Sequence, residues 1–321
     1  MLKSIQNQGV YQEFLDAVKV NKQPGKLGLL RSARLPLAAA LCEDLNVPIL
    51  IVTDRTDRAL LMFDELNFWL PGIPKYYFPE PTPMFYEQAA WGSLARRERL
   101  AALARLSLYH KPGTQKPGLP CVVVAPIRAV MTRTLPRRDF ILSSKTITLG
   151  MKAAPEAMLR DWMRLGYESA DVVVDHGQFS RRGGILDVWP PAEDYPYRLE
   201  FFGDIVDTLR QFDPATQRTV KNLEFFHITP AREYLTDQEQ DLEALPETSG
   251  EFNIPVLHPF ASTILDYLPD KGLILIDDAQ NVQGFGEEIE TQALKNRAES
   301  IQEGTLQADF PIPYVSWSEI L

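Results

Sequence analysis

The stretch from residue 28 to residue 35 reads GLLRSARL and matches in part the loop pattern that binds nucleotide phosphates. In the pattern G-x-x-x-x-G-K-[ST], the glycines let the backbone approach the phosphates, the lysine reaches the terminal phosphates and the hydroxyl binds Mg²⁺. Gly28 fits this pattern, but the later positions hold Ala33, Arg34 and Leu35. An ordinary helix start is the alternative interpretation. We therefore expect neither ATP binding, nor Mg²⁺ binding, nor catalysis at this loop.

Two carboxylates, Asp277 and Asp278, end the apolar stretch GLILIDDAQN (272–281). An acidic pair at the end of a buried strand is where a helicase-like protein would carry its acidic motif, although a solvated loop can have the same sequence. Together with Gly28, the pair suggests a nucleotide-binding fold that has lost its nucleotide.

A second candidate stretch is FSRRGGILDVWP (179–190), in which two arginines run directly into two glycines. A catalytic loop, an anion cradle and the edge of a hairpin are all compatible with it. His176 and Asp187 could exchange protons, but no nucleophile or metal spacing joins them. Structural hydrogen bonds are the favoured role for both residues.

The composition limits the function classes. The chain has 321 residues, 45% of them hydrophobic, a net charge of −10 and four scattered histidines. Such an acidic chain is not expected to grip nucleic acid tightly by itself. Cys42 and Cys121 are the only cysteines and form no zinc-binding spacing, so we expect no metal site and a reducing compartment. With no signal-like segment and no long apolar run, we expect a soluble, cytoplasmic protein and no membrane partner.

Short apolar runs alternate with helical patterns over the first 140 residues. PILIVT (48–53) and CVVVAP (121–126) are typical of strands buried on both faces, and residues 58–70 and 94–106 have helical spacing. This alternation predicts an α/β domain with a parallel sheet, and GLILIDDAQN predicts another strand of it.

The pattern changes near residue 140. Short runs such as KTITLG, VVVDHGQFS, GGILDVW and LEFFHITP surround one helix at about 154–165. We expect residues 1–143 to begin the α/β domain, 144–232 to form an inserted α+β domain, and 233–321 to return to the first. The acidic stretch 236–251 is expected to be a solvated helix-and-loop connection.

Residues 172–220 strongly resemble the corresponding domain of bacterial transcription-repair coupling factors and the homologous domain of UvrB proteins. The motifs that carry the resemblance are RGGILDVWP, PYRLEFFGDIVDTLRQFD and TQRT. The resemblance is looser over the first 140 residues and thin over the last 85. UvrB proteins have an intact phosphate loop and a long DNA-clamping hairpin, where this chain has only FPEPTPMFYEQAAWGS (78–93). These departures favour the N-terminal module of the coupling factors.

In these families the inserted domain binds UvrA, and the resemblance places the contacts on Arg182, Arg198 and Phe202. Arg181 and Glu200 are further candidates. Alternation along a strand supports this, because it puts Arg198, Glu200 and Phe202 on one face. We expect Phe202 at the centre of the patch with the guanidiniums beside it, and truncation of any of the three to weaken binding with little effect on folding. The alternatives are a solvated arginine pair and a Phe202 ring packed under helix 154–165.

The sequence thus predicts a degenerate helicase-like (P-loop-type) α/β domain that carries an inserted UvrA-binding domain. Its predicted function is non-catalytic recruitment in transcription-coupled DNA repair, without a cofactor. The rival interpretation is a UvrB-like, DNA-loading helicase subunit with weak ATPase activity. The resemblance also implies that a complete factor contacts RNA polymerase and moves along double-stranded DNA with ATP and Mg²⁺, through domains absent from this chain.

Overall fold

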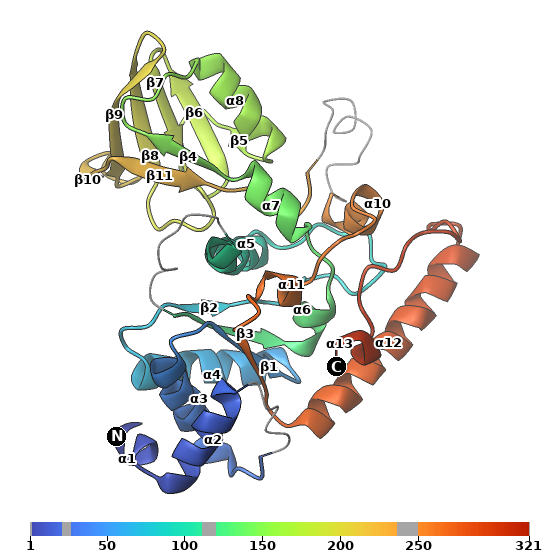
Figure 1. Cartoon of the computed structure of the whole chain (residues 1–321). Helices are drawn as coiled ribbons and strands as arrows, with labels where there is room; N and C mark the ends of the chain where they lie inside the picture. Colours follow the sequence, from blue (N-terminus) through green and yellow to red (C-terminus); the bar gives the residue numbers. More distant parts are fainter. Residues whose placement is uncertain (1, 21–26, 111–119, 236–249, 321) are drawn as a thin grey trace.

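The computed structural model describes residues 2–20, 27–110, 120–235 and 250–320 (Figure 1). Within them the chain forms a four-stranded, a six-stranded and a two-stranded sheet, surrounded by helices. None of the helices in these ranges is long and apolar enough to cross a membrane.

The four-stranded sheet is parallel throughout. Its order is β12 (Leu273–Ile276), β1 (Ile49–Thr53), β3 (Val122–Pro126) and β2 (Lys75–Tyr77). Every residue of β1 and β3 is buried, as expected for parallel strands covered on both faces. The predicted parallel α/β sheet is therefore confirmed.

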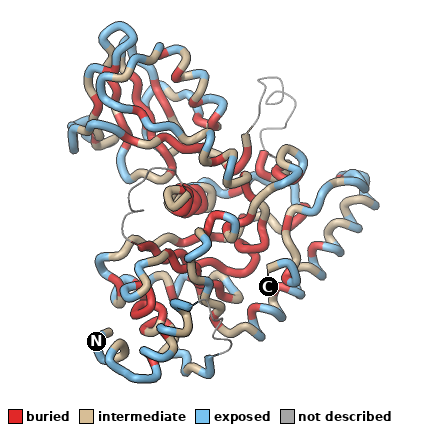
Figure 2. Tube along the Cα trace, in the orientation of Figure 1, coloured by how far each residue is buried: buried red, intermediate tan, exposed pale blue. Residues whose placement is uncertain are grey.

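Helices cover both faces of this sheet. Ile49 and Ile51 face α3 (Arg31–Leu45) and α4 (Thr56–Trp69), while Leu50 and Val52 face the other side. That second side packs against α5 (Ser93–Ser107), α6 (Ile127–Met131) and α12 (Ala279–Gln302). Figure 2 shows the buried residues concentrated in the strands and in α5. The short elements around this core are α1 (Leu2–Gln6), α2 (Gly9–Lys19), η1 (Leu108–His110), α7 (Arg137–Ser143), η2 (Glu251–Asn253), α10 (Ile254–Leu257), α11 (Ile264–Tyr267) and α13 (Trp317–Ile320).

The segment that matches the phosphate loop leads into α3. Residues 27–30 form neither helix nor strand, and α3 begins at Arg31. A true phosphate loop connects a strand directly to its helix, whereas here β1 comes after α3. The P-loop character of the fold therefore stays a prediction.

The segment that starts near residue 144 contains the predicted strands and single helix. β4 (Lys145–Thr148) pairs with β11 (Phe225–Ile228), and α8 (Pro155–Arg164) buries Met158 and Trp162 against the neighbouring sheet. That sheet has the order β10 (Thr219–Asn222), β9 (Ile205–Phe212), β8 (Tyr197–Phe202), β7 (Ile185–Val188), β6 (Gln178–Arg182) and β5 (Glu168–Ser169). One predicted strand is wrong in its first half, because residues 172–177 form a loop and β6 begins only at Gln178.

After β11 the chain returns to the first sheet, where β12 pairs in parallel with β1. This agrees with an interrupted α/β domain, although the limits at residues 143 and 232 stay predictions. Most of the predicted acidic connection, residues 236–249, lies outside the described residues.

A fully buried ion pair joins α5 to the segment that follows β11 of the two-stranded sheet. Arg99 donates to both carboxylate oxygens of Glu233, at 2.6 and 2.9 Å, and neither side chain is exposed. The Arg99 guanidinium also lies 4.1 Å from the ring centroid of Phe78 and 4.8 Å from that of Trp91, and it donates to the Pro79 carbonyl. This desolvated charge pair therefore connects the α/β body, through α5, to the segment that follows β11.

Candidate functional site

The segment that matches the phosphate-loop pattern contributes to an ion-pair cluster around Asp277. Arg34, which aligns with the lysine of the phosphate-loop pattern, donates to Asp277 at 2.5 Å, and Arg58 donates to the other oxygen of Asp277 at 2.8 Å. Burial works to raise the pKa of Asp277, but the hydrogen bonds from Arg58 and Arg34 outweigh it and hold this pKa below its ordinary value. The residue at the lysine position is thus already bonded to the acid at the strand end.

The other residues that match the pattern, and Asp278 of the acidic pair, lie in the core, in a helix, at a helix end or in open space. Leu35 is buried in the core against β1, and Ala33 lies in the first turns of α3. A Cβ atom at Gly28 would meet no atom within 4 Å, so no close approach demands a glycine there. Asp278 caps α12 by accepting a hydrogen bond from the Asn281 amide.

The second candidate site lies on the six-stranded sheet, on the face turned away from α8. We call this the outer face. Since residues alternate along each strand and the opposite face forms the core with α8, it carries Ser180, Arg182, Asp187, Arg198, Glu200, Phe202, Arg210 and Phe212. The sequence prediction that Arg198, Glu200 and Phe202 share a face is confirmed.

Arg182 and Arg198 converge on Asp187, which lies between them on β7. Arg198 Nε and Nη2 donate to Asp187 Oδ1 and Oδ2 at 2.7 and 2.8 Å, and Arg182 Nη2 donates to Oδ2 at 2.8 Å. The Asp187 side chain is only 2% exposed. We call these three residues the Asp187 cluster.

The two arginines of the Asp187 cluster have unequal surroundings. The Arg198 side chain is 11% exposed, donates also to Gln217 Oε1 and stacks over Phe212, with 4.2 Å from its guanidinium carbon to the ring centroid. The Arg182 side chain is 47% exposed. Arg198 is therefore a packed part of the sheet, and Arg182 is the arginine available to a partner. The expectation that Arg198 could be truncated with little effect on folding conflicts with this packing.

Phe202 lies at the end of β8 and is 78% exposed. This exposure contradicts the alternative in which the ring packs under α8. Ile205, its cross-strand neighbour on β9, is 45% exposed, so the two side chains form an apolar tip on the outer face. The ring is not central as predicted, because it lies four residues beyond Arg198 on the same strand.

The glycines after Arg182 form a hairpin turn. Arg182 pairs with Ile185, and Gly183 between them has a φ of +62°. The β8–β9 turn after Phe202 has the same form, with Gly203 at a φ of +59°. Glycine is favoured at the first position of such turns because it adopts positive φ without a steric cost. The Phe201 amide donates to the Gly184 carbonyl at 2.9 Å, so the two turns lie side by side.

The two further candidates, Arg181 and Glu200, lie on opposite faces of the six-stranded sheet. Glu200 lies on the outer face and accepts a hydrogen bond from Arg210. Arg181 alternates to the other face, where it pairs with Glu156 of α8 at 2.6 Å. Arg181 is therefore not part of the same surface as Arg182.

His176 has the ring contact and hydrogen bond expected of a structural histidine. Its ring lies 4.2 Å from that of Trp189, and Nε2 lies 3.1 Å from the Glu193 carbonyl oxygen. Burial lowers the pKa of His176 below its ordinary value. Nowhere in the described ranges do three or more metal-ligating side chains gather into a group that could hold an ion.

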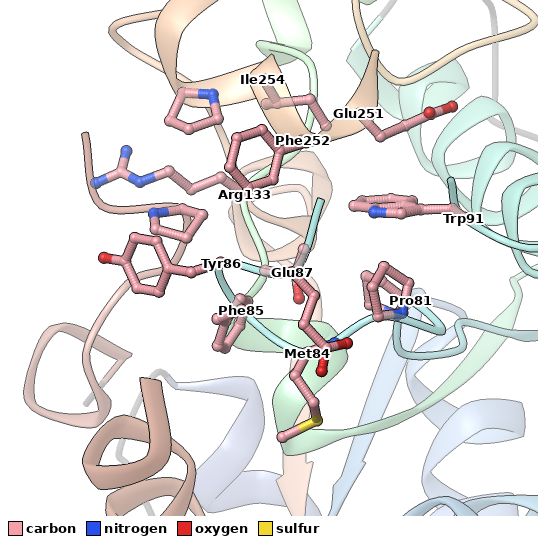
Figure 3. A pocket seen from close by; sticks show the side chains of 14 residues that line it. Pro81, Met84, Phe85, Tyr86, Glu87, Trp91, Arg133, Glu251, Phe252 and Ile254 are labelled. Carbon is pink, nitrogen blue, oxygen red and sulfur yellow. The ribbon is translucent and has the colours of Figure 1, made fainter. Parts of the chain in front are cut away.

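Figure 3 shows a cavity that lies apart from both sites. It is lined by the irregular segment around Phe85 and Tyr86 and by residues of η2 and α10, including Phe252. Its volume of about 40 Å³ has room for a water molecule or two, not for a nucleotide. The segment from Pro81 to Trp91 thus packs against η2, α10 and Pro313.

The sequence did not reveal several residues of the outer face. The sequence favours a structural role for Asp187 but does not indicate its two arginine partners, and it gives no special signal at Phe212, Gln217, Arg210 or Ile205. Their positions follow from strand register, which pairs Asp187 with Arg198 and Phe202 with Ile205. A hairpin turn at Gly183–Gly184 would have been the signal, because it fixes the register of β6 and β7.

Comparison with known proteins gives the class of this domain. Residues 146–234, which contain the six-stranded sheet and the Asp187 cluster, match the family model of the UvrB interaction domain. This segment is thus similar to UvrB-type interaction domains, and a parallel α/β body carries it.

Two kinds of curated protein are similar to most of the chain. The transcription-repair-coupling factor of Myxococcus xanthus is 29% identical over 84% of this chain and 25% of its own length, and that of Bacillus subtilis (strain 168) is 25% identical over 89% and 27%. The UvrABC system protein B of Gloeothece citriformis is 28% identical over 74% of this chain and 36% of its own length. The resemblance to coupling factors and UvrB proteins is confirmed, and the chain spans about a quarter of the coupling factors that it matches.

Proposed function

We propose that this chain is a recruitment module that binds UvrA through the outer face of its six-stranded sheet. The observation that supports this most is the pairing of a 78% exposed phenylalanine with an exposed arginine on one sheet face of a UvrB interaction domain. Large exposed aromatic and arginine side chains are typical of the residues that dominate the energy of protein interfaces.

The charge of the outer face indicates the chemistry of the contact. Among the ion pairs of this face, Arg182, Arg198 and Arg210 share two carboxylates, Asp187 and Glu200, so this group of five side chains carries one net positive charge. Arg182 is the most exposed of the three arginines, and the excess charge is most accessible there. A guanidinium can hold a carboxylate with two parallel hydrogen bonds. We therefore expect an acidic side chain of UvrA opposite Arg182 and an apolar pocket opposite Phe202 and Ile205.

The direct test is capture of purified UvrA by the immobilised chain, with affinity then measured by calorimetry. The matched control carries Arg182→Ala and Phe202→Ala together and should capture much less. A folded wild-type chain that fails to bind UvrA would refute the proposed function. In a protein as long as the coupling factors, contacts with RNA polymerase and duplex DNA would belong to other regions.

We propose further that the chain neither binds nor hydrolyses ATP. Calorimetric titration with Mg²⁺ and ATP should show no saturable binding, because the triphosphate would have to break the Arg34–Asp277 bond and would find no hydroxyl at Leu35. Micromolar affinity that is abolished by Arg34→Ala would contradict this and favour the rival function, a UvrB-like helicase subunit. An ATPase with an intact phosphate loop serves as the positive control.

A further inference from the structure

We propose that Asp187 is a positioning residue of the partner-binding surface: it holds the guanidinium of Arg182 in the orientation in which a partner carboxylate meets it. This inference rests on the proposed function. It assigns the two arginines different tasks, with Arg182 as the contact and Arg198 as the anchor of Asp187.

Arg198 fixes the orientation of the Asp187 carboxylate. Arg198 approaches it with Nε and Nη2, one nitrogen to each oxygen, which is the paired geometry in which guanidinium and carboxylate planes align. Arg198 is itself fixed by the ring of Phe212 and by Gln217 Oε1. The carboxylate therefore has little freedom to rotate.

Arg182 depends on that carboxylate. Its side chain is 47% exposed, and the hydrogen bond that connects it to the sheet runs from Nη2 to Asp187 Oδ2. A long arginine side chain on a surface samples many rotamers, and a partner that binds it must immobilise it. Because Asp187 has already restricted the guanidinium, part of this entropic cost is met before the partner arrives.

Asp187 does not have to release Arg182 when a partner binds. A guanidinium carries five N–H donors, and the bond to Asp187 uses one on Nη2. The remaining donors can bind a second carboxylate. Asp187 is 98% buried as a side chain, so it faces the arginines and not the solvent from which the partner comes.

The experiment is a double-mutant cycle on UvrA affinity with Asp187→Asn, Arg182→Ala and the combination. Asn keeps the shape of the side chain but removes its charge and places an N–H donor against guanidinium donors. Asp187→Asn should weaken UvrA binding about tenfold, the size expected for immobilising one flexible side chain. In the Arg182→Ala background it should change affinity less than about twofold, because the residue through which it acts is gone.

Asp171→Asn is the matched control, since it removes an exposed carboxylate in the loop that follows β5 and outside the Asp187 cluster, and it should leave affinity unchanged. Equal weakening by Asp187→Asn in both backgrounds would show a general loss of structure and overturn the proposal. Unchanged or tighter binding would overturn it too, because Asp187 would then compete with UvrA for Arg182.

A second measurement needs no partner and separates this proposal from the proposed function. Relaxation of the Arg182 side-chain nitrogen, followed by NMR with ¹⁵N-labelled arginine, should show a restricted guanidinium in the wild-type chain and a mobile one in Asp187→Asn. A mobile Arg182 in the wild type refutes the positioning role whether or not UvrA binds. Absence of UvrA binding with a restricted Arg182 refutes the proposed function and, with it, the assignment of this surface to a partner.

Discussion

Replacing Phe202 with alanine is expected to weaken UvrA binding about thirtyfold or more, which corresponds to roughly 2 kcal/mol. The ring is 78% exposed and forms the apolar tip of the outer face with Ile205, so its truncation removes contact area without opening a cavity. The melting temperature should stay nearly the same, since exposed positions usually change stability by less than about 0.5 kcal/mol. Calorimetry with UvrA and thermal unfolding on the same preparation measure both effects.

Phe225→Ala is the control for this prediction. Phe225 is also an exposed phenylalanine, at 53%, but it lies on β11 in the two-stranded sheet and not on the outer face. Its truncation should leave UvrA affinity unchanged. Wild-type affinity in Phe202→Ala, or a loss of stability of about 3–5 kcal/mol as for a core phenylalanine, would remove Phe202 from the binding surface.

Breaking the Arg99–Glu233 pair is expected to have the largest effect on stability. Arg99→Leu and Glu233→Gln should each lower the free energy of unfolding by about 3–5 kcal/mol, because the remaining charge stays buried without its partner. Neither side chain has measurable exposure, and the Arg99 guanidinium lies near two aromatic rings. Urea denaturation of the single variants measures the loss.

The double substitution Arg99→Met with Glu233→Leu should recover most of this loss, since replacing a whole buried pair with apolar side chains is often neutral or stabilising. Lys295→Ala is the control, because it removes an exposed pair with Glu299 on α12 that should contribute only about 0.3–0.5 kcal/mol. Single variants that lose no more than this control would show that the buried pair is not what holds the two parts of the chain together.

The sequence was sufficient for the features that depend on local periodicity. The continuous apolar runs at 49–53 and 122–126 indicate strands covered on both faces, and both are buried throughout. The alternation in residues 197–202 places Phe202 with Arg198 and away from the core for the same reason. The same rule would have separated Arg181 from Arg182, had the limits of β6 been known.

Contacts between distant segments could not be predicted in this way. Arg34 and Asp277 are 243 positions apart, and nothing in either local sequence shows that they meet. The burial of Asp187 depends on the register of β7 against β8, which sets it opposite Arg198. Local residue types show that an arginine or a carboxylate is present, but long-range packing decides which of them remains available to a partner.

The bonding of Asp277 to two arginines bears on how this chain could change in evolution. A lysine placed at position 34 would still lack a neighbouring hydroxyl at Leu35 and a second glycine at Ala33, while Arg58 would keep its bond to Asp277. Removing Arg34 or Arg58 alone would take a hydrogen bond from a carboxylate whose side chain is 5% exposed and would lower stability. Each single substitution toward the phosphate-loop pattern therefore costs stability or gains nothing, so this position could acquire the full pattern only through several changes at once.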